Sequence, residues 1–133
     1  MRSFHLEIVT PDGAAFDGEA ESLLVRTDNG DVEILASHTD YIASVGTGRA
    51  RIIADGKERL ASSSGGFLTV ESGNVRLVAI TFEFADEIDL DRAQRAKEAA
   101  EATIAAARDD KSVELAKAKL QRALSRINVA NGK

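Results

Sequence analysis

The sequence predicts an all-β sandwich or barrel of about ten short strands, followed by an antiparallel hairpin of two helices. Residues 1–88 contain all six aromatic residues, the only proline and nine of the ten glycines. Residues 89–131 contain no glycine, proline or aromatic residue. Frequent glycine and proline are typical of a chain that turns often, and their absence from a long segment predicts helices. We therefore divide the chain into a β domain, residues 1–86, and a two-helix arm, residues 87–133.

The β domain is predicted from regularly spaced turns and the short segments between them. Apolar and polar residues alternate in segments 3–8 and 23–27, whereas segments 67–70 and 75–80 are almost wholly apolar. Such segments, separated by turns about every ten residues, predict a small antiparallel sandwich or barrel. A domain of this size has room for one core and no deep active-site cleft. The turns are Pro11-Asp12-Gly13, Asn29-Gly30, Asp55-Gly56 and Gly73-Asn74.

The arm is predicted as two amphipathic helices joined by Asp109-Asp110. Asp89 is expected to cap the first helix, and Asp110 the second. An alanine stripe buries little apolar surface, so the helices are expected to pair weakly. Alanine and long charged residues favour helix, so each helix is expected to survive separation from the other. The stripes, spaced three and four residues apart, are Ala93, Ala96, Ala100, Ile104 and Ala107, then Val113, Ala116, Leu120, Ala123, Leu124 and Ile127.

Charge is divided unevenly along the 133 residues, whose net charge is −5. Residues 1–88 hold 7 Lys/Arg against 15 Asp/Glu, whereas residues 89–133 hold 10 against 7. From Lys111 onward the count is 6 against 1. A basic arm on an acidic domain implies that the arm meets an anionic group. That group could be a nucleotide, an acidic protein surface, nucleic acid or the β domain itself, and a solvated helix face is the simpler alternative.

Several function classes are excluded by composition. The chain has no cysteine, so it forms no disulfide or thiolate metal site, and His5 and His38 lack further ligands at a suitable spacing. No catalytic constellation is present, so we expect a protein that is not an enzyme. Without a signal peptide or an apolar segment of ~20 residues, we expect an intracellular protein that does not insert into the membrane. The basic helix lacks aromatic residues for stacking, which argues against nucleic acid.

A cluster of arginines is the one candidate site. An antiparallel hairpin places residues equidistant from its turn opposite each other, so Arg122 and Arg126 are expected near Arg92 and Arg95. Several guanidinium groups facing one another require an anion between them, and the planar guanidinium suits phosphate. The alternative is ordinary surface charge, with Asp89 acting only as a helix cap.

Motifs along the whole chain resemble the epsilon subunit of the bacterial F-type ATP synthase in order and spacing. Segment Ile88-Asp89-Leu90-Asp91-Arg92-Ala93 fits the ATP-binding pattern of that family, Ile/Leu-Asp-x-x-Arg-Ala. The matching segments of the β domain are Val9 to Gly13, Gly30-Asp31, Ile34-Leu35 with His38, Ser64 to Leu68 and Val75 to Ala79. Each motif is weak alone, but their combination is specific.

The resemblance implies a non-catalytic subunit of the central stalk that couples proton-driven rotation to ATP synthesis. It implies a β domain docked on the gamma subunit and on the c-subunit rotor ring, peripheral to the cytoplasmic side of the bacterial membrane. Its arm would bind ATP when folded, without metal, and inhibit ATP hydrolysis when extended against the alpha and beta subunits. The implied ATP-binding residues are Glu83, Asp89, Arg92, Arg122 and Arg126. The implied inhibitory contacts are Lys111, Lys117, Lys119, Arg122 and Arg126.

One departure from the family bears on ATP. Some ATP-binding relatives carry an arginine at the position of Ala99, so we expect ATP to bind more weakly here, or not at all. Because an ionised aspartate repels phosphate, Asp89 is expected to hold the base or to orient Arg92. The alternative to an ATP sensor is a structural coupling subunit whose hairpin neither opens nor binds nucleotide.

Overall fold

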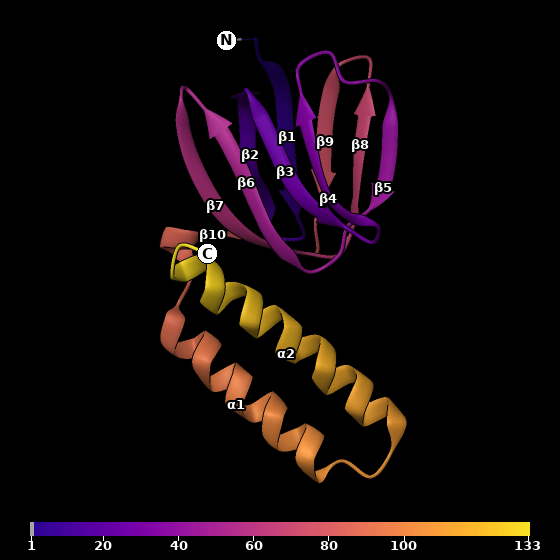
Figure 1. The fold of residues 1–133 in the computed structure, drawn as a ribbon, viewed down its shortest axis with the longest axis vertical. Coiled ribbons are helices and arrows are strands. Elements are labelled where there is room, and N and C mark those ends of the chain that lie inside the picture. The colour runs from indigo at the N-terminus through magenta and orange to yellow at the C-terminus, as the bar shows by residue number, and fades with distance from the viewer. Residues whose placement is uncertain (1) are drawn as a thin grey trace.

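The computed structural model describes residues 2–133 and consists of a β-sandwich with a helical hairpin beneath it (Figure 1). One sheet has the strand order β2-β1-β9-β8-β5, and the other has the order β10-β7-β6-β3-β4. The predicted fold class, a sandwich followed by a two-helix hairpin, is confirmed. The strands are β1 (Phe4–Thr10), β2 (Gly13–Ala20), β3 (Ser22–Thr27), β4 (Gly30–Leu35), β5 (Tyr41–Ser44), β6 (Gly48–Ala54), β7 (Lys57–Ser64), β8 (Phe67–Glu71), β9 (Asn74–Val78) and β10 (Thr81–Phe84).

One strand pairing departs from the predicted antiparallel pattern. β1 runs parallel to β9, with Leu6 opposite Val75 and Ile8 opposite Leu77. All four of these side chains are buried between the two sheets, and for Leu6 and Ile8 the alternation in β1 predicted this. Because the two strands run in the same direction, the end of β1 lies beside the end of β9. This pairing thereby brings the turn after Thr10 to the edge of the sandwich from which the helices leave.

The turn between β7 and β8 depends on glycine. Gly66 has a φ of +91°, and a Cβ atom at that position would lie 1.7 Å from the carbonyl oxygen of Val78. No side chain can be accommodated there without moving β9, so glycine is required for both its conformation and its small size. The glycine pair after Ser64 therefore serves as a tight turn between strands.

The arm consists of a 3₁₀ turn, Ala85–Glu87, followed by α1 (Leu90–Ala106) and α2 (Asp110–Ala130). The carboxylate of Asp89 accepts a hydrogen bond from the backbone N–H of Arg92 at 3.0 Å, which confirms the predicted first cap. The second predicted cap was wrong by one residue. Asp109, and not Asp110, caps α2 by accepting the backbone N–H of Ser112 at 2.8 Å. This bond and a second one from the Ser112 hydroxyl lower the pKa of Asp109 below its ordinary value of 3.8.

The two helices form an antiparallel pair, and α2 lies between α1 and the sandwich (Figure 1). Small residues fill the contact between the helices, where Ala93, Ala100, Ala116 and Ala123 are buried. α2 packs on the outer face of the sheet that contains β6 and β7. There the hydroxyl groups of Ser62 and Ser125 are 2.7 Å apart and share a hydrogen bond. Within residues 2–133, neither helix is both long enough and apolar enough to span a membrane.

Candidate functional site

A cavity of about 420 Å³ lies where the hairpin joins the sandwich, and we call it the junction cavity. Its walls come from the turn after β1, from β10 and from the ends of both helices nearest the sandwich. It is lined by Thr10, Asp12, Ile80, Thr81, Phe82, Glu83, Glu87, Asp89, Arg92, Ala93, Ala96 and Arg126. The cavity therefore collects side chains from segments that are far apart in the sequence.

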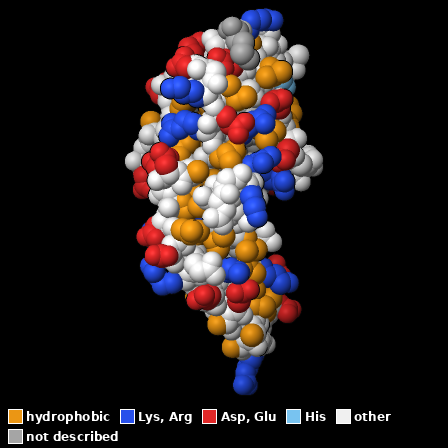
Figure 2. All heavy atoms as spheres, turned by 60° about the vertical axis from the view of Figure 1, so that its left-hand side comes forward, with side chains coloured by type: hydrophobic (Ala, Val, Ile, Leu, Met, Phe, Trp, Pro, Cys, Tyr) orange, Lys and Arg blue, Asp and Glu red, His pale blue; other side chains and the backbone are white. Residues whose placement is uncertain are grey.

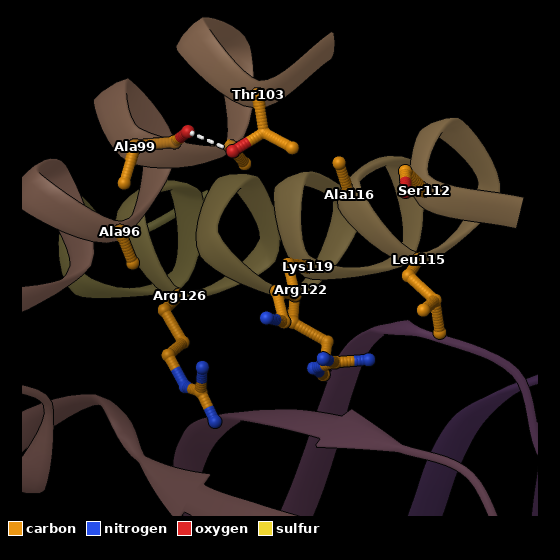
Figure 3. Close-up of a pocket in the computed structure, with 10 residues that line it drawn as sticks. Ala96, Ala99, Thr103, Ser112, Leu115, Ala116, Lys119, Arg122 and Arg126 are labelled. Carbon is orange, nitrogen blue, oxygen red and sulfur yellow. Dashed lines mark hydrogen bonds between the residues drawn. The ribbon is translucent and has the colours of Figure 1, made fainter. Parts of the chain in front are cut away.

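A second cavity, of about 480 Å³, runs between the two helices, and we call it the interhelical groove. The side chains of Lys119, Arg122 and Arg126 leave α2 on the same side of the helix (Figure 3). Small residues of α1 form the opposite wall. The groove is lined by Ala96, Ala99, Ala100, Thr103, Ser112, Leu115, Ala116, Lys119, Arg122 and Arg126. Ala96 and Arg126 line both cavities, so the groove lies next to the junction cavity.

The two cavities differ in charge. Four carboxylates line the junction cavity, those of Asp12, Glu83, Glu87 and Asp89, against two arginines. The interhelical groove is lined by three cations and by no carboxylate. An elongated ligand with one anionic end would therefore place that end in the groove and its neutral or hydrogen-bonding end at the junction.

Arg126 stands where the two cavities meet. Its Nε–H donates a hydrogen bond to the carboxylate of Glu83 at 2.5 Å. The Arg126 side chain is 27% exposed and that of Glu83 is 37% exposed, so the pair is only partly screened by water. The bond uses Nε, and the two terminal amino groups of the guanidinium still carry donors that could bind a phosphate. Glu83 thus both neutralises Arg126 and fixes its orientation.

The structure divides the predicted ATP-binding residues between the two cavities. Glu83, Asp89 and Arg92 line the junction cavity, Arg122 lines the groove, and Arg126 lines both. Asp89 uses one carboxylate oxygen as the cap of α1, so it acts at least as a structural residue. Arg95, which was expected near the pair from α2, lines neither cavity.

The residues predicted for an inhibitory contact all lie on α2. Lys119, Arg122 and Arg126 line the groove, whereas Lys111 and Lys117 line neither of the two cavities. Lys117 lies 3.8 Å from the carboxylate of Glu114, one turn away on the same helix. The five basic residues of α2 therefore form two groups, three that line the groove and two that lie outside both cavities.

The residues of the junction cavity that sequence reasoning did not assign to a site include Thr10, Asp12 and Glu87. The first two enter the site through the parallel pairing of β1 with β9, and no local pattern reports a pairing between such distant segments. The position of Glu87 could have been predicted from the sequence, because it depends on a local contact. The Glu87 carboxylate accepts a hydrogen bond from the backbone N–H of Phe84, three residues earlier, at 3.0 Å. Within residues 2–133, no group of three acidic or histidine side chains has a geometry suited to a metal ion.

Both parts of the chain match models of known protein families. Residues 3–85 match the family described as ATP synthase, Delta/Epsilon chain, beta-sandwich domain. Residues 86–131 match the family described as ATP synthase, Delta/Epsilon chain, long alpha-helix domain. The chain belongs to the ATP synthase delta/epsilon chain family.

Similar proteins agree with this assignment. The ATP synthase epsilon chain of Shouchella clausii is 38% identical over 133 residues, covering 100% of this chain and 98% of that protein. The epsilon chain of Bacillus velezensis is 39% identical over 130 residues, covering 98% of both. A chain in the cryo-EM structure of Euglena gracilis mitochondrial ATP synthase superposes with a TM-score of 0.83 at 21% identity, covering 97% of this chain and 81% of that one. At that identity the superposition supports the fold alone.

Proposed function

We propose that the chain is the epsilon subunit of a bacterial F-type ATP synthase and forms part of its central stalk. Support comes from family membership over nearly the full length and from relatives named as epsilon chains. Solved structures with the same fold belong to complexes whose descriptions include the central stalk and the c-ring. In this role the sandwich docks on the gamma subunit and the rotor ring, on the cytoplasmic side of the membrane. The subunit transmits rotation and catalyses no reaction itself.

We further propose that the folded hairpin binds ATP. The observation that carries this proposal is the division of charge between two adjacent cavities that share Arg126. The base and ribose would occupy the junction cavity, where carboxylates can accept hydrogen bonds from the amino and hydroxyl groups of a nucleoside. The phosphates would lie in the interhelical groove, where Arg122 and Arg126 can neutralise them without a metal ion.

The hairpin can act as a sensor because it has two states. ATP stabilises the folded state only through contacts that the extended state lacks, and here those contacts come from both helices and from β10. The alanine contact between the helices buries little apolar area, so it adds little to the stability of the folded state. When ATP falls, α2 would leave the sandwich and present Lys111, Lys117, Lys119, Arg122 and Arg126 to an acidic surface of the catalytic subunits. Because Arg122 and Arg126 serve both states, each state excludes the other.

Calorimetric titration of the isolated protein with ATP tests this proposal. Wild type is expected to bind saturably with a Kd between about 1 µM and 1 mM, and Arg126→Ala is expected to bind at least tenfold more weakly. Lys97→Ala is a matched control, since Lys97 lies on α1 and lines neither cavity. No binding by wild type at several times the upper end of that Kd range would refute the ATP site.

One observation favours the alternative, a purely structural subunit with a permanently closed hairpin. α2 is attached to the sandwich by protein contacts, the Arg126–Glu83 pair and the Ser62–Ser125 hydrogen bond. If ATP does not bind and α2 stays docked in the assembled enzyme, these contacts define the function of the arm.

A further inference from the structure

We propose that Lys119 binds the terminal phosphate of the nucleotide and makes the site prefer a nucleoside triphosphate over a diphosphate. This inference rests on the proposed ATP site and assigns a specificity-determining residue within it. It gives Lys119 a role in the folded arm, in addition to the one proposed for the extended arm.

Distance from the junction separates Lys119 from the two arginines. Arg126 lies at the entrance to the junction cavity, Arg122 lies one turn further along α2, and Lys119 lies nearly one turn beyond that. Seven residues of α-helix span about 10.5 Å. The three cations therefore form a row that leads from the junction toward the turn between the helices.

Charge fixes the direction in which a nucleotide would lie along this row. Phosphates are repelled from the junction cavity, where carboxylates outnumber arginines four to two. The phosphate nearest the ribose would then meet Arg126, and successive phosphates would lie further along the groove. The last phosphate, which a diphosphate lacks, would lie furthest along the groove, where the flexible side chain of Lys119 can extend to meet it.

Lys119 is suited to this task because it is not committed to a carboxylate. No ion pair is formed by Lys119 within the described chain, whereas Lys117 lies 3.8 Å from Glu114. Lys119 is exposed, lines the groove and has a flexible side chain. On the opposite wall Ala99 provides no charge. Among the three cations of the groove, Lys119 lies furthest along α2 from the junction.

The test compares ATP and ADP binding in matched variants. Lys119→Ala is expected to weaken ATP binding about tenfold and to change ADP binding less than twofold, because one charge-assisted hydrogen bond is lost only with the triphosphate. Lys119→Arg keeps the charge and is expected to retain the preference for ATP. Lys97→Ala removes a lysine outside both cavities and is expected to change neither affinity.

The outcomes separate this inference from the proposed function. Equal weakening of ATP and ADP by Lys119→Ala, or no weakening of either, would overturn the assignment. If Arg126→Ala abolishes ATP binding while Lys119→Ala leaves it intact, the ATP site stands and only the role of Lys119 fails. If wild type binds neither nucleotide, both proposals fail. Far-UV circular dichroism of each variant verifies that the helices remain folded.

Discussion

The ion pair between Arg126 and Glu83 is predicted to hold the arm closed when no nucleotide is bound. We consider Arg126→Gln, Glu83→Gln and the double variant, each of which removes charge while keeping a side chain of similar size. The pair links α2 directly to β10 by a bond of 2.5 Å. Its loss is therefore expected to favour release of α2 from the sandwich.

The magnitude follows from the exposure of the two side chains, 27% and 37%. A charge-assisted hydrogen bond contributes about 1.5–3 kcal/mol when buried, and a fully exposed ion pair contributes less than about 1 kcal/mol. For this intermediate case we take about 1 kcal/mol, which changes the ratio of open to closed arms about fivefold. Each single variant is thus expected to open about five times more often. The double variant should open no more often than either single variant, because both substitutions remove the same interaction.

Thiol labelling can measure the opening. The chain has no cysteine, so Val129→Cys introduces a unique thiol at a position that is 1% exposed and lies between α2 and the sandwich. When closing is faster than labelling, the labelling rate is proportional to the open population. Lys117→Ala in the same background serves as the control, because Lys117 forms its ion pair within α2.

Two results would refute the reasoning. Labelling rates that are unchanged by either single variant would show that the pair adds nothing to docking. A double variant that labels about 25-fold faster, the product of two independent fivefold effects, would show that each side chain acts separately. A high salt concentration should reduce the difference between wild type and variants, since it screens exposed charges.

Three further predictions concern other parts of the chain. Gly66→Ala is expected to destabilise the sandwich by more than about 2 kcal/mol, since its Cβ would collide with the Val78 carbonyl, and urea unfolding measures the loss. Because the folded pKa of Asp109 is depressed, its capping carboxylate stabilises α2 above pH 3.8 and is lost as the pH falls through the folded pKa. Asp109→Ala should therefore be less helical than wild type at neutral pH and equal to it well below pH 3.8, as measured by circular dichroism. Ala99→Arg adds a cation to the groove and is expected to strengthen ATP binding about tenfold in a calorimetric titration; an unchanged Kd would contradict the placement of the phosphates.

The fold could be predicted because its signals are local. Alternation in β1 identified Phe4, Leu6 and Ile8 as core residues, and all three are buried. The carboxylate of Asp89 before a helical stripe identified the start of α1. The cap of α2 was misplaced because Asp109 and Asp110 are equally good caps in composition, and only the backbone conformation distinguishes them.

The site could be predicted only in part, because it is assembled from segments that meet through the tertiary fold. Hairpin symmetry placed the arginines of α2 beside the first helix, but it could not show that Glu83 engages Arg126. That contact depends on α2 lying against β7 and β6, and on β10 pairing with β7. The entry of Asp12 into the junction depends likewise on the parallel pairing of the first and ninth strands.

The layered arrangement of the arm limits the ways in which its two helices can move relative to the sandwich. α2 is covered on one side by the sandwich and on the other by α1, and only the first turns of α1 approach the sandwich (Figure 1). Apolar side chains are visible between the charged side chains of the arm (Figure 2). The helices pack through small residues such as Ala100 and Ala116. α1 is held at both ends, by residues 85–89 at the sandwich and by residues 107–109 at α2, so it cannot separate along its whole length while α2 stays docked. Release of α2 therefore either moves the hairpin as one body about residues 85–89 or breaks the alanine contact between the helices, and a molecule that joined α1 to α2 would leave only the first route.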